Sequence, residues 1–193
     1  MHVEPIEYTP AVFLDRDGTI NEDVGYLQNI EQLTLIPGAA QGIRILNNYG
    51  FKVVVVTNQS GVARGYFREE FIVQTHDHLR AVLQRENAII DAFYYCPHHP
   101  AEGFPPYRKT CSCRKPEAGM LIQAACDLHL DLSRSYMVGD KIQDIQAGKK
   151  AGVKTILVKT GYGCFVEEKD NLSEYVAHDL FSAAQWIANN IAK

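Results

Sequence analysis

Five short apolar segments constrain the fold of this chain more than any other feature. They span residues 11–15, 52–58, 92–96, 135–140 and 154–159. Each is nearly continuous in apolar or β-favouring residues and lacks the strict alternation of a strand with one exposed face. Such runs are typical of strands that are buried on both faces of a parallel sheet. We therefore predict a central parallel sheet.

Helical patterns fill the intervals between these segments. Ala39, Ile43 and Leu46 share one helical face before Gly50, which indicates an amphipathic helix that ends at the glycine. Further helices are predicted in residues 68–86, 117–130, 144–152 and 180–192. Strands that alternate with helices favour right-handed crossovers. The predicted fold class is therefore α/β, a three-layer Rossmann-like sandwich with the parallel sheet in the middle.

The whole chain is expected to form a single domain, residues 1–193. Its length and its 46% of hydrophobic residues are enough for one sizeable core. The net charge is −4 and the pI is about 6.0, which gives no electrostatic support for a nucleic-acid or membrane partner. The N-terminal residues lack the features of a secretory signal, and no apolar run is long enough to span a bilayer. We expect a cytoplasmic protein.

Polar residues gather where the predicted strands end, and ligands bind at the carboxyl ends of strands in folds of this kind. The candidates are Asp15 and Asp17 after the first strand, Thr57, Asn58 and Ser60 after the second, Arg114 and Lys115 after a cysteine-rich segment, and Asp140 and Asp144 after the fourth. Any one of these aspartates alone is most often a turn or helix-cap residue, and a lone lysine is most often solvated. Their joint occurrence at one edge of the sheet favours a shared site.

Phosphoryl transfer is the chemistry that such a set suits. One carboxylate can attack phosphorus and form an aspartyl phosphate. Two or more carboxylates can hold Mg²⁺, which prefers hard oxygen ligands. A lysine and a hydroxyl can stabilise charge on the phosphoryl oxygens. A further acid can protonate the leaving alkoxide and later deprotonate the attacking water.

The cysteine-rich segment, residues 96–113, forms a second candidate site with the spacing Cys-x-His, twelve residues, Cys-x-Cys. The candidate Zn²⁺ ligands are Cys96, His98, Cys111 and Cys113, a sound tetrahedral set. In a reducing compartment, clustered cysteines favour a metal over disulfides. Four protein ligands leave no open position, so the zinc would be structural. His99 could replace His98, but alternate residues of an extended segment point the same way, which favours His98.

The remaining cysteines and the helical histidines are assigned no chemistry. Cys126 lies in an apolar helical pattern and is expected in the core, whereas Cys164 is isolated. His76, His78 and His129 are expected on helix surfaces.

Four motifs, "FLDRDGT", "VVVTNQSG", "CRKP" and "MVGDKIQD", resemble in order those of the haloacid dehalogenase (HAD) phosphatase superfamily, across nearly the whole chain. The resemblance implies that Asp15 is the nucleophile and that Asp17 is the general acid/base, with its backbone carbonyl on Mg²⁺. It implies that Thr57 and Lys115 hold the phosphoryl group and that Asp140 is a Mg²⁺ carboxylate.

The longer patterns "FLDRDGTINED.GY", "VVVTNQSGVARG", "YYCPHHP", "C.CRKP..GM" and "SYMVGDK" are similar to the D-glycero-D-manno-heptose 1,7-bisphosphate 7-phosphatases. The resemblance implies hydrolysis of the 7-phosphate in the route to lipopolysaccharide core, and zinc in the cysteine segment. It implies substrate contacts from Asp23, Val24, Gly25, Tyr26, Thr57, Asn58, Gln59, Ser60, Arg114 and Lys115. Lys141 and Asp144 would lie beside the metal site.

A large cap domain of the kind found in many HAD relatives is not expected. Only 41 residues separate Asp15 from Thr57, and the predicted helix and strand use most of them. Substrate selection must then come from loops, of which the cysteine segment is the largest. We expect a small sugar phosphate as substrate, with a lean to the β anomer, and a monomer.

Two other functions remain open from the sequence. Histidinol-phosphate phosphatases share the fold, the first motif and a zinc loop, but "GVARG" after "TNQS" favours the heptose enzymes. A non-enzymatic phospho-acceptor or zinc-loop interaction module is the third reading, although an acid two residues after Asp15 suits turnover. Arg64 is open as well: it is either an additional anion contact or a surface residue at a helix entry.

Overall fold

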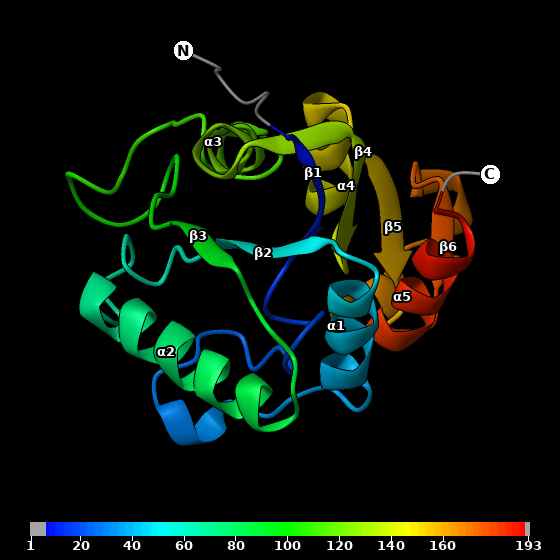
Figure 1. Ribbon diagram of the computed structural model, residues 1–193. Helices are drawn as coiled ribbons and strands as arrows, with labels where there is room; N and C mark the ends of the chain where they lie inside the picture. Colours follow the sequence, from blue (N-terminus) through cyan, green and yellow to red (C-terminus); the bar gives the residue numbers. More distant parts are fainter. Residues whose placement is uncertain (1–6, 192–193) are drawn as a thin grey trace, which may run out of the picture.

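The computed structural model describes residues 7–191. Its centre is one six-stranded parallel sheet with the strand order β3-β2-β1-β4-β5-β6 (Figure 1). The strands are β1 (Thr9–Leu14), β2 (Lys52–Asn58), β3 (Ala92–Cys96), β4 (Leu130–Gly139), β5 (Lys154–Val158) and β6 (Tyr175–Ala177). The predicted parallel sheet is confirmed, and its five expected strands are all present.

Helices cover both faces of the sheet, so the predicted three-layer α/β sandwich is confirmed. The helices are α1 (Ala39–Asn48), α2 (Glu69–Arg85), α3 (Gly119–Leu128), α4 (Ile142–Ala151) and α5 (Leu180–Asn189), with short 3₁₀ turns at Ile30–Gln32, Gly161–Phe165 and Glu168–Asp170. Helices α1, α2 and α5 lie on one face, and α3 and α4 on the other (Figure 1). Between Asp15 and Thr57 the described chain holds only a 3₁₀ turn, α1 and β2 as regular elements.

The central strand β1 is buried on both faces, as its continuous apolar sequence indicates. Val12 and Leu14 belong to the core under α1 and α5, whereas Ala11 and Phe13 belong to the core under α3 and α4. All four side chains have no exposed surface.

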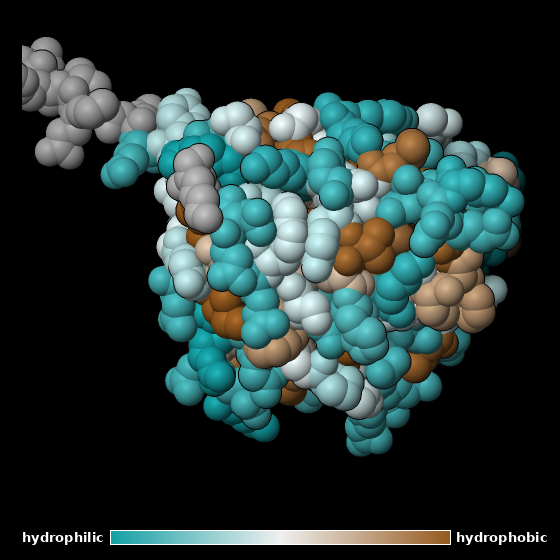
Figure 2. Space-filling model, turned by 90° about the vertical axis from the view of Figure 1, so that its right-hand side faces the viewer, coloured by the Kyte–Doolittle hydropathy of each residue, from teal (hydrophilic) through white to brown (hydrophobic). Residues whose placement is uncertain are grey.

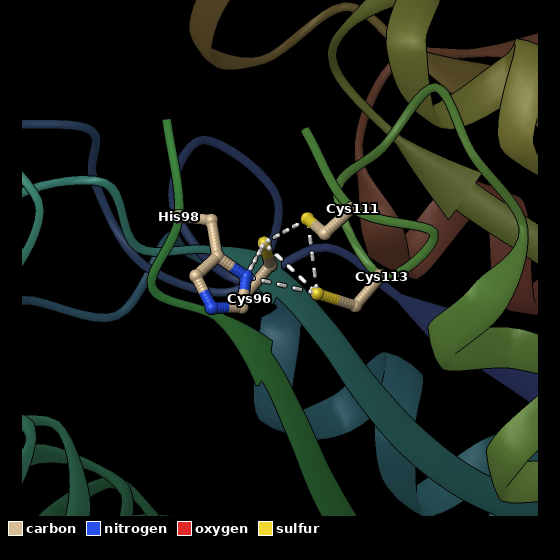
Figure 3. A group of neighbouring side chains, drawn as sticks. All are labelled: Cys96, His98, Cys111 and Cys113. Carbon is tan, nitrogen blue, oxygen red and sulfur yellow. Dashed lines mark hydrogen bonds between the residues drawn. The ribbon is translucent and has the colours of Figure 1, made fainter. Parts of the chain in front are cut away.

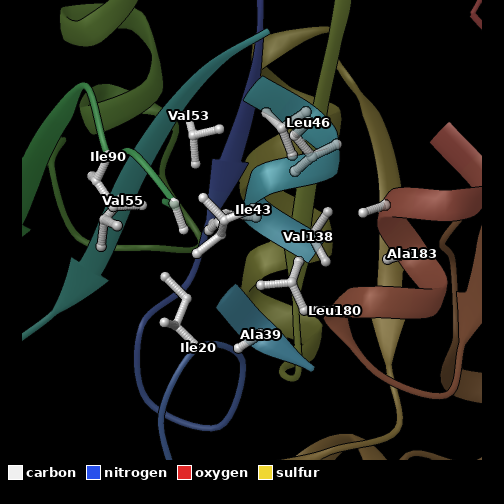
Figure 4. Packing of buried hydrophobic residues seen from close by; sticks show 14 of the residues in the cluster. Ile20, Ala39, Ile43, Leu46, Val53, Val55, Ile90, Val138, Leu180 and Ala183 are labelled. Carbon is white, nitrogen blue, oxygen red and sulfur yellow. The ribbon is translucent and has the colours of Figure 1, made fainter. Parts of the chain in front are cut away.

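The predicted face of α1 packs into the larger core. Ile43 and Leu46 lie against Val53 of β2 and against Leu180 of α5 (Figure 4). Ala39 lies in the same cluster. Helices α1 and α5 therefore pack as a pair on one face of the sheet.

Four expectations about individual elements were wrong. Strand β6 was not predicted, because its three residues give too short an apolar run to detect. Strand β4 begins at Leu130, five residues earlier than expected. Strand β3 is only half-buried except at Cys96, because it lies at the sheet edge with β2 as its one neighbour. Cys126 is exposed on α3 rather than in the core.

The expected surface position of His76 was also wrong. His76 is 5% exposed and stacks on Phe93 with 4.5 Å between ring centroids. It lies on the buried face of α2 together with Ile72, Thr75 and Leu79. Burial, and then the charge of Arg16, lower the pKa of His76 to about 3, so this imidazole is neutral at physiological pH.

On the face of the molecule over β6 and α5, hydrophilic side chains dominate and hydrophobic ones form small separate patches (Figure 2). Among residues 7–191, no helix combines the length and the apolar character needed to cross a membrane.

Candidate active site

Strands β1 and β4 place two carboxylates side by side where the strand order changes direction, which is the usual ligand position in such sheets. Asp15 follows β1, and its backbone N–H donates to the carbonyl of Val138 in β4 at 3.0 Å. Asp140 follows β4 directly. Gly18 turns the first loop with φ +86°, and a Cβ there would lie 2.3 Å from Asp140 Oδ2. Glycine is therefore required at position 18 for the loop to approach Asp140.

Three buried carboxylates meet at this point. Asp15, Asp140 and Asp144 each offer an oxygen within 4.8 Å of the others. Burial, and then the charge of Asp15, raise the pKa of Asp140 to about 8. Burial raises the pKa of Asp144 to about 6 against the opposing effect of Lys115. Clustered buried carboxylates of this kind are stabilised by a cation.

Asp144 and Asp140 differ in whether both of their carboxylate oxygens have a partner. Asp144 Oδ1 contacts Lys115 Nζ at 2.6 Å, and its Oδ2 accepts from the Lys141 N–H at 2.9 Å. Asp140 Oδ2 accepts from the Tyr162 N–H at 2.8 Å, but its buried Oδ1 has no hydrogen-bond partner. An orphaned carboxylate oxygen that faces another acid fits a hard divalent cation such as Mg²⁺.

Lys115 is buried among these acids rather than solvated. Its Nζ lies 2.9 Å from Asp15 Oδ1 and 2.6 Å from Asp144 Oδ1, and it donates to the Val56 carbonyl at 2.7 Å. Asn58 fixes its backbone with two hydrogen bonds, to the Lys115 carbonyl and from the Lys115 N–H. Burial opposes its charge, but the two carboxylates raise its pKa, so Lys115 remains an ammonium ion.

Asp17 is held as a carboxylate on the other side of Asp15. Arg16 donates to both of its oxygens, at 2.7 to 3.0 Å, and Asn21 donates at 3.0 Å. Gln59 Nε2 donates to Asp17 Oδ2 and to Thr57 Oγ1, with a distance of 2.9 Å in both hydrogen bonds. Burial opposes ionisation, but Arg16 and these hydrogen bonds lower the pKa of Asp17. The sequence analysis did not identify Arg16 or Asn21 as partners of the acid.

A cleft of about 450 Å³ opens above these groups. It is lined by Asp15, Asp17, Asp23, Gly25, Tyr26, Thr57, Asn58, Ser60, Arg114, Lys115, Lys141, Gln143, Asp144 and Tyr162. The structure therefore brings together most of the residues expected to bind substrate. Val24 is not among the lining residues and is 48% exposed. Gln59 is absent from the lining too, because it is bonded to Thr57 and Asp17.

The sequence analysis missed Gln143 and Tyr162 in this lining. Tyr162 follows β5 in the segment "TGYG", and the Lys141 ammonium lies 4.7 Å from its ring centroid. Lys141 also pairs with Asp23 at 2.9 Å. The fifth strand ends at the same sheet edge as the others, so inspection of its carboxyl end could have found Tyr162.

The four predicted zinc ligands form a compact cluster (Figure 3). The sulfur atoms of Cys96, Cys111 and Cys113 lie 3.2 to 3.5 Å apart, and His98 Nδ1 lies 3.4 Å from Cys113 Sγ. Zn–S bonds of about 2.3 Å in a tetrahedron separate sulfurs by roughly 3.8 Å, so the cluster fits one zinc ion with a small expansion.

His99 points away from this cluster. Its Nδ1 accepts from the backbone N–H of Glu102 at 2.8 Å and of Ala101 at 3.3 Å. Its Nε2 faces Arg64 at 3.5 Å. The ring nitrogen that lies among the cysteine sulfurs therefore belongs to His98.

Comparison with known proteins gives consistent matches. A family model described as HAD-hydrolase-like matches residues 112–183. A D-glycero-beta-D-manno-heptose-1,7-bisphosphate 7-phosphatase from Salmonella typhi is 43% identical over 184 residues, covering 95% of this chain and 92% of the relative. A D-glycero-D-manno-heptose-1,7-bisphosphate 7-phosphatase from Thermosynechococcus vestitus is 44% identical, covering 95% of this chain and 97% of the relative.

A solved structure of similar sequence shares the fold. The D,D-heptose 1,7-bisphosphate phosphatase of B. bronchiseptica, crystallised with magnesium and phosphate, is 34% identical with a TM-score of 0.84, covering 94% of this chain and 99% of that one. The sequence patterns, the fold and these relatives agree, and the chain belongs to the D-glycero-D-manno-heptose-1,7-bisphosphate 7-phosphatase family of HAD phosphatases.

Proposed function

We propose that this protein is a Mg²⁺-dependent phosphatase that removes the 7-phosphate of D-glycero-D-manno-heptose 1,7-bisphosphate through an aspartyl phosphate on Asp15. The observation that supports this most is the buried Lys115 ammonium, which lies within 2.9 Å of Asp15 and 2.6 Å of Asp144 beneath an open cleft. Both sequence relatives named above are heptose-1,7-bisphosphate 7-phosphatases by name, and the name of the Salmonella typhi relative specifies the β anomer. We propose the β anomer here as well.

The first half of the reaction transfers the phosphoryl group to Asp15. A carboxylate oxygen of Asp15 forms a bond to phosphorus as the bond from phosphorus to the substrate's C7 oxygen breaks. Lys115 and the Thr57 hydroxyl stabilise charge on the phosphoryl oxygens. Asp17 gives the leaving alkoxide the proton that it took from the attacking water in the previous cycle, and becomes a carboxylate.

The second half returns the enzyme to its starting state. Asp17, now a carboxylate, takes a proton from a water molecule that attacks the phosphoaspartate, and inorganic phosphate leaves as Asp15 is restored. Arg16, Asn21 and Gln59 hold Asp17 in this ionised form. The hydrogen bonds seen in the structure thus suit the step that needs a base.

Mg²⁺ would be held by the carboxylates of Asp15 and Asp140 and by the backbone carbonyl of Asp17. When bound there, it would offset repulsion between the attacking carboxylate and the phosphate dianion. The orphaned Oδ1 of Asp140 supports this assignment. Lys115 and the backbone N–H of Lys141 occupy both oxygens of Asp144. We therefore propose that Asp144 orients Lys115.

Zn²⁺ is proposed as a structural ion on Cys96, His98, Cys111 and Cys113. Arg114 and Lys115 follow the last of these ligands directly, and Arg114 Nη1 donates to the His98 carbonyl at 3.0 Å. The cysteine-rich segment 96–113, called the zinc loop from here on, would therefore fix the direction from which both cations enter the cleft. The remaining nitrogens of Arg114 would meet an anionic group of the substrate.

Kinetics on three substrates tests the proposal. We expect kcat/KM to be highest on the β anomer of heptose 1,7-bisphosphate, lower on the α anomer and far lower on histidinol phosphate. Asp15→Asn should lower kcat on the order of 10³-fold or more, since the amide cannot act as the nucleophile. Asp170→Asn, a change at an exposed residue, is the control. A preference for histidinol phosphate, or normal turnover by Asp15→Asn, would overturn the proposal.

A further inference from the structure

Arg64 lies where the loop after β2 meets the zinc loop and the loop that carries Tyr26. Neither of the two roles considered from the sequence, an anion contact or a surface residue, describes it. It follows β2, its side chain is 23% exposed, and it does not line the cleft. Its guanidinium forms an ion pair with Glu102 of the zinc loop and lies 5.6 Å from the ring centroid of Tyr26. Because Glu102 already offsets its charge, Arg64 is poorly placed to bind a substrate anion.

On the zinc-loop side, hydrogen bonds to a side chain hold the turn that carries Glu102. His99 Nδ1 accepts from the Glu102 and Ala101 N–H groups, so the turn that carries Glu102 is closed by a side chain. With this lone pair in use, the neutral ring carries its proton on Nε2, the atom that faces Arg64. Two donors do not form a hydrogen bond, so Glu102 is the anionic partner of Arg64 in the zinc loop.

The two loops also touch backbone to backbone. The Phe104 N–H donates to the Ala63 carbonyl at 3.1 Å. Gly103 has φ +86°, and a Cβ there would lie 1.8 Å from the same carbonyl. No side chain fits between the loops, which brings Glu102 within reach of Arg64.

The cleft side of the junction is aromatic. Tyr26 lines the cleft. Its ring packs edge-on against the ring of Tyr66, with 4.7 Å between the ring centroids. Arg64 lies over the same ring. Residues of the loop after β2 therefore hold the Tyr26 ring through two contacts, and one of them depends on the zinc loop.

We propose that Arg64 is a positioning residue that sets Tyr26 against the substrate and is itself held by Glu102. The zinc loop would thereby influence substrate fit through a side chain that does not touch the substrate. This inference rests on the proposed function only for the sugar substrate used in the kinetic measurement.

Kinetics on two substrates provides the first test. In Arg64→Met and Glu102→Gln, we expect the KM for heptose 1,7-bisphosphate to rise roughly fivefold, the effect of losing about 1 kcal/mol of interaction. The kcat should stay within about twofold, and kcat/KM for p-nitrophenyl phosphate, which has no sugar to fit, should not change.

The double variant should be no worse than Arg64→Met, because the two residues act as one unit. Arg64→Lys, which keeps the charge, should recover part of the loss, and Arg108→Met is the control for removing an exposed cation of the zinc loop.

Hydrogen exchange provides a second test that does not depend on the substrate. Protection of residues 23–28 should fall in Arg64→Met and Glu102→Gln, while β1 stays protected and Arg108→Met matches wild type. Unchanged exchange in both variants would overturn the proposal. An equal loss of kcat/KM on the sugar and aryl substrates would also overturn it, since Arg64 would then act on the phosphoryl group. If wild type did not turn over the heptose substrate, the proposed function would fail while the exchange test still decided the role of Arg64.

Discussion

His76 is a buried histidine of α2 that lies within the influence of the charged residues after β1. His76 stacks on Phe93, and the charges that act on its ring belong to Arg16, Asp17 and Arg80. Its Nε2 is buried without a hydrogen-bond partner. Protonation would place an uncompensated cation in this position, which is why its pKa falls to about 3.

We predict that His76 makes the protein lose stability on acidification. The unfolded chain binds a proton below a pKa of about 6.5, whereas the folded chain does not until about 3. The unfolded state therefore binds more protons across this window, and the free energy of unfolding falls by about 1.4 kcal/mol per pH unit as pH decreases. Urea titrations at pH 7 and pH 5 should show a smaller difference in His76→Phe than in wild type. His78→Gln, an exposed histidine of the same helix, is the control and should behave like wild type.

Lys115 is the second residue whose burial has a measurable consequence. Lys115→Met leaves Asp15 and Asp144 facing each other without a cation, which should lower the free energy of unfolding by about 3–5 kcal/mol. Adding Asp144→Asn removes one of the two charges and should restore part of that loss. Activity should stay absent in both variants, because the charge beside the phosphoryl group is missing. Equal stabilities of the single and double variants would show that the ion pair does not hold the site together.

At the scale of elements, loop 96–113 is a segment whose order needs an explanation. It contains four prolines and little regular structure, yet the two cations of the cleft, Arg114 and Lys115, follow it directly. Burial raises the pKa of the Cys96 thiol, so three adjacent thiolates would need a cation to coexist. A structural metal supplies it and closes the loop at both ends.

Replacing one zinc ligand should therefore damage both order and catalysis. We expect Cys111→Ser to lose the roughly one zinc per chain that metal analysis would find in wild type, and to unfold at a lower temperature. Its kcat should also fall, because Arg114 and Lys115 lose their fixed entry into the cleft. Cys126→Ser and Cys164→Ser change exposed cysteines outside the cluster, and both should retain zinc. A Cys111→Ser protein as stable and active as these controls would argue against a structural ion.

The elements also differ in how well the sequence predicts them. Strands β1 and β2 were predictable because they are buried on both faces and read as unbroken apolar runs. Strand β6 was missed because it has only three residues. Strand β3 was predicted with the correct bounds, but its apolar sequence overstated its burial, because it is an edge strand with half-exposed side chains. His76 lies four residues after Ile72 and three before Leu79, so helical spacing is compatible with its place on the buried face of α2. Spacing alone does not show how far that face extends or that Phe93 covers it.

At the scale of the whole molecule, the protein is expected to act as a monomer. On the face over β6 and α5, apolar patches are small and separate (Figure 2), whereas stable dimers bury larger contiguous surfaces. Light scattering coupled to size exclusion should give a mass near 21.6 kDa at micromolar concentration. A mass twice as large, independent of dilution, would contradict this expectation.

The sequence by itself determined the α/β class, the parallel sheet and the set of groups at its carboxyl edge, because buried strands and strand-end motifs are local features of the chain. Only the tertiary structure decided how those groups pair: Lys115 with Asp15 and Asp144, Asp17 with Arg16 and Gln59, and Arg64 with Glu102. Most of these partners are tens of residues apart in the chain. Their contacts arise from the register of adjacent strands and from loops that pack against one another, and neither is encoded in spacing along a single segment.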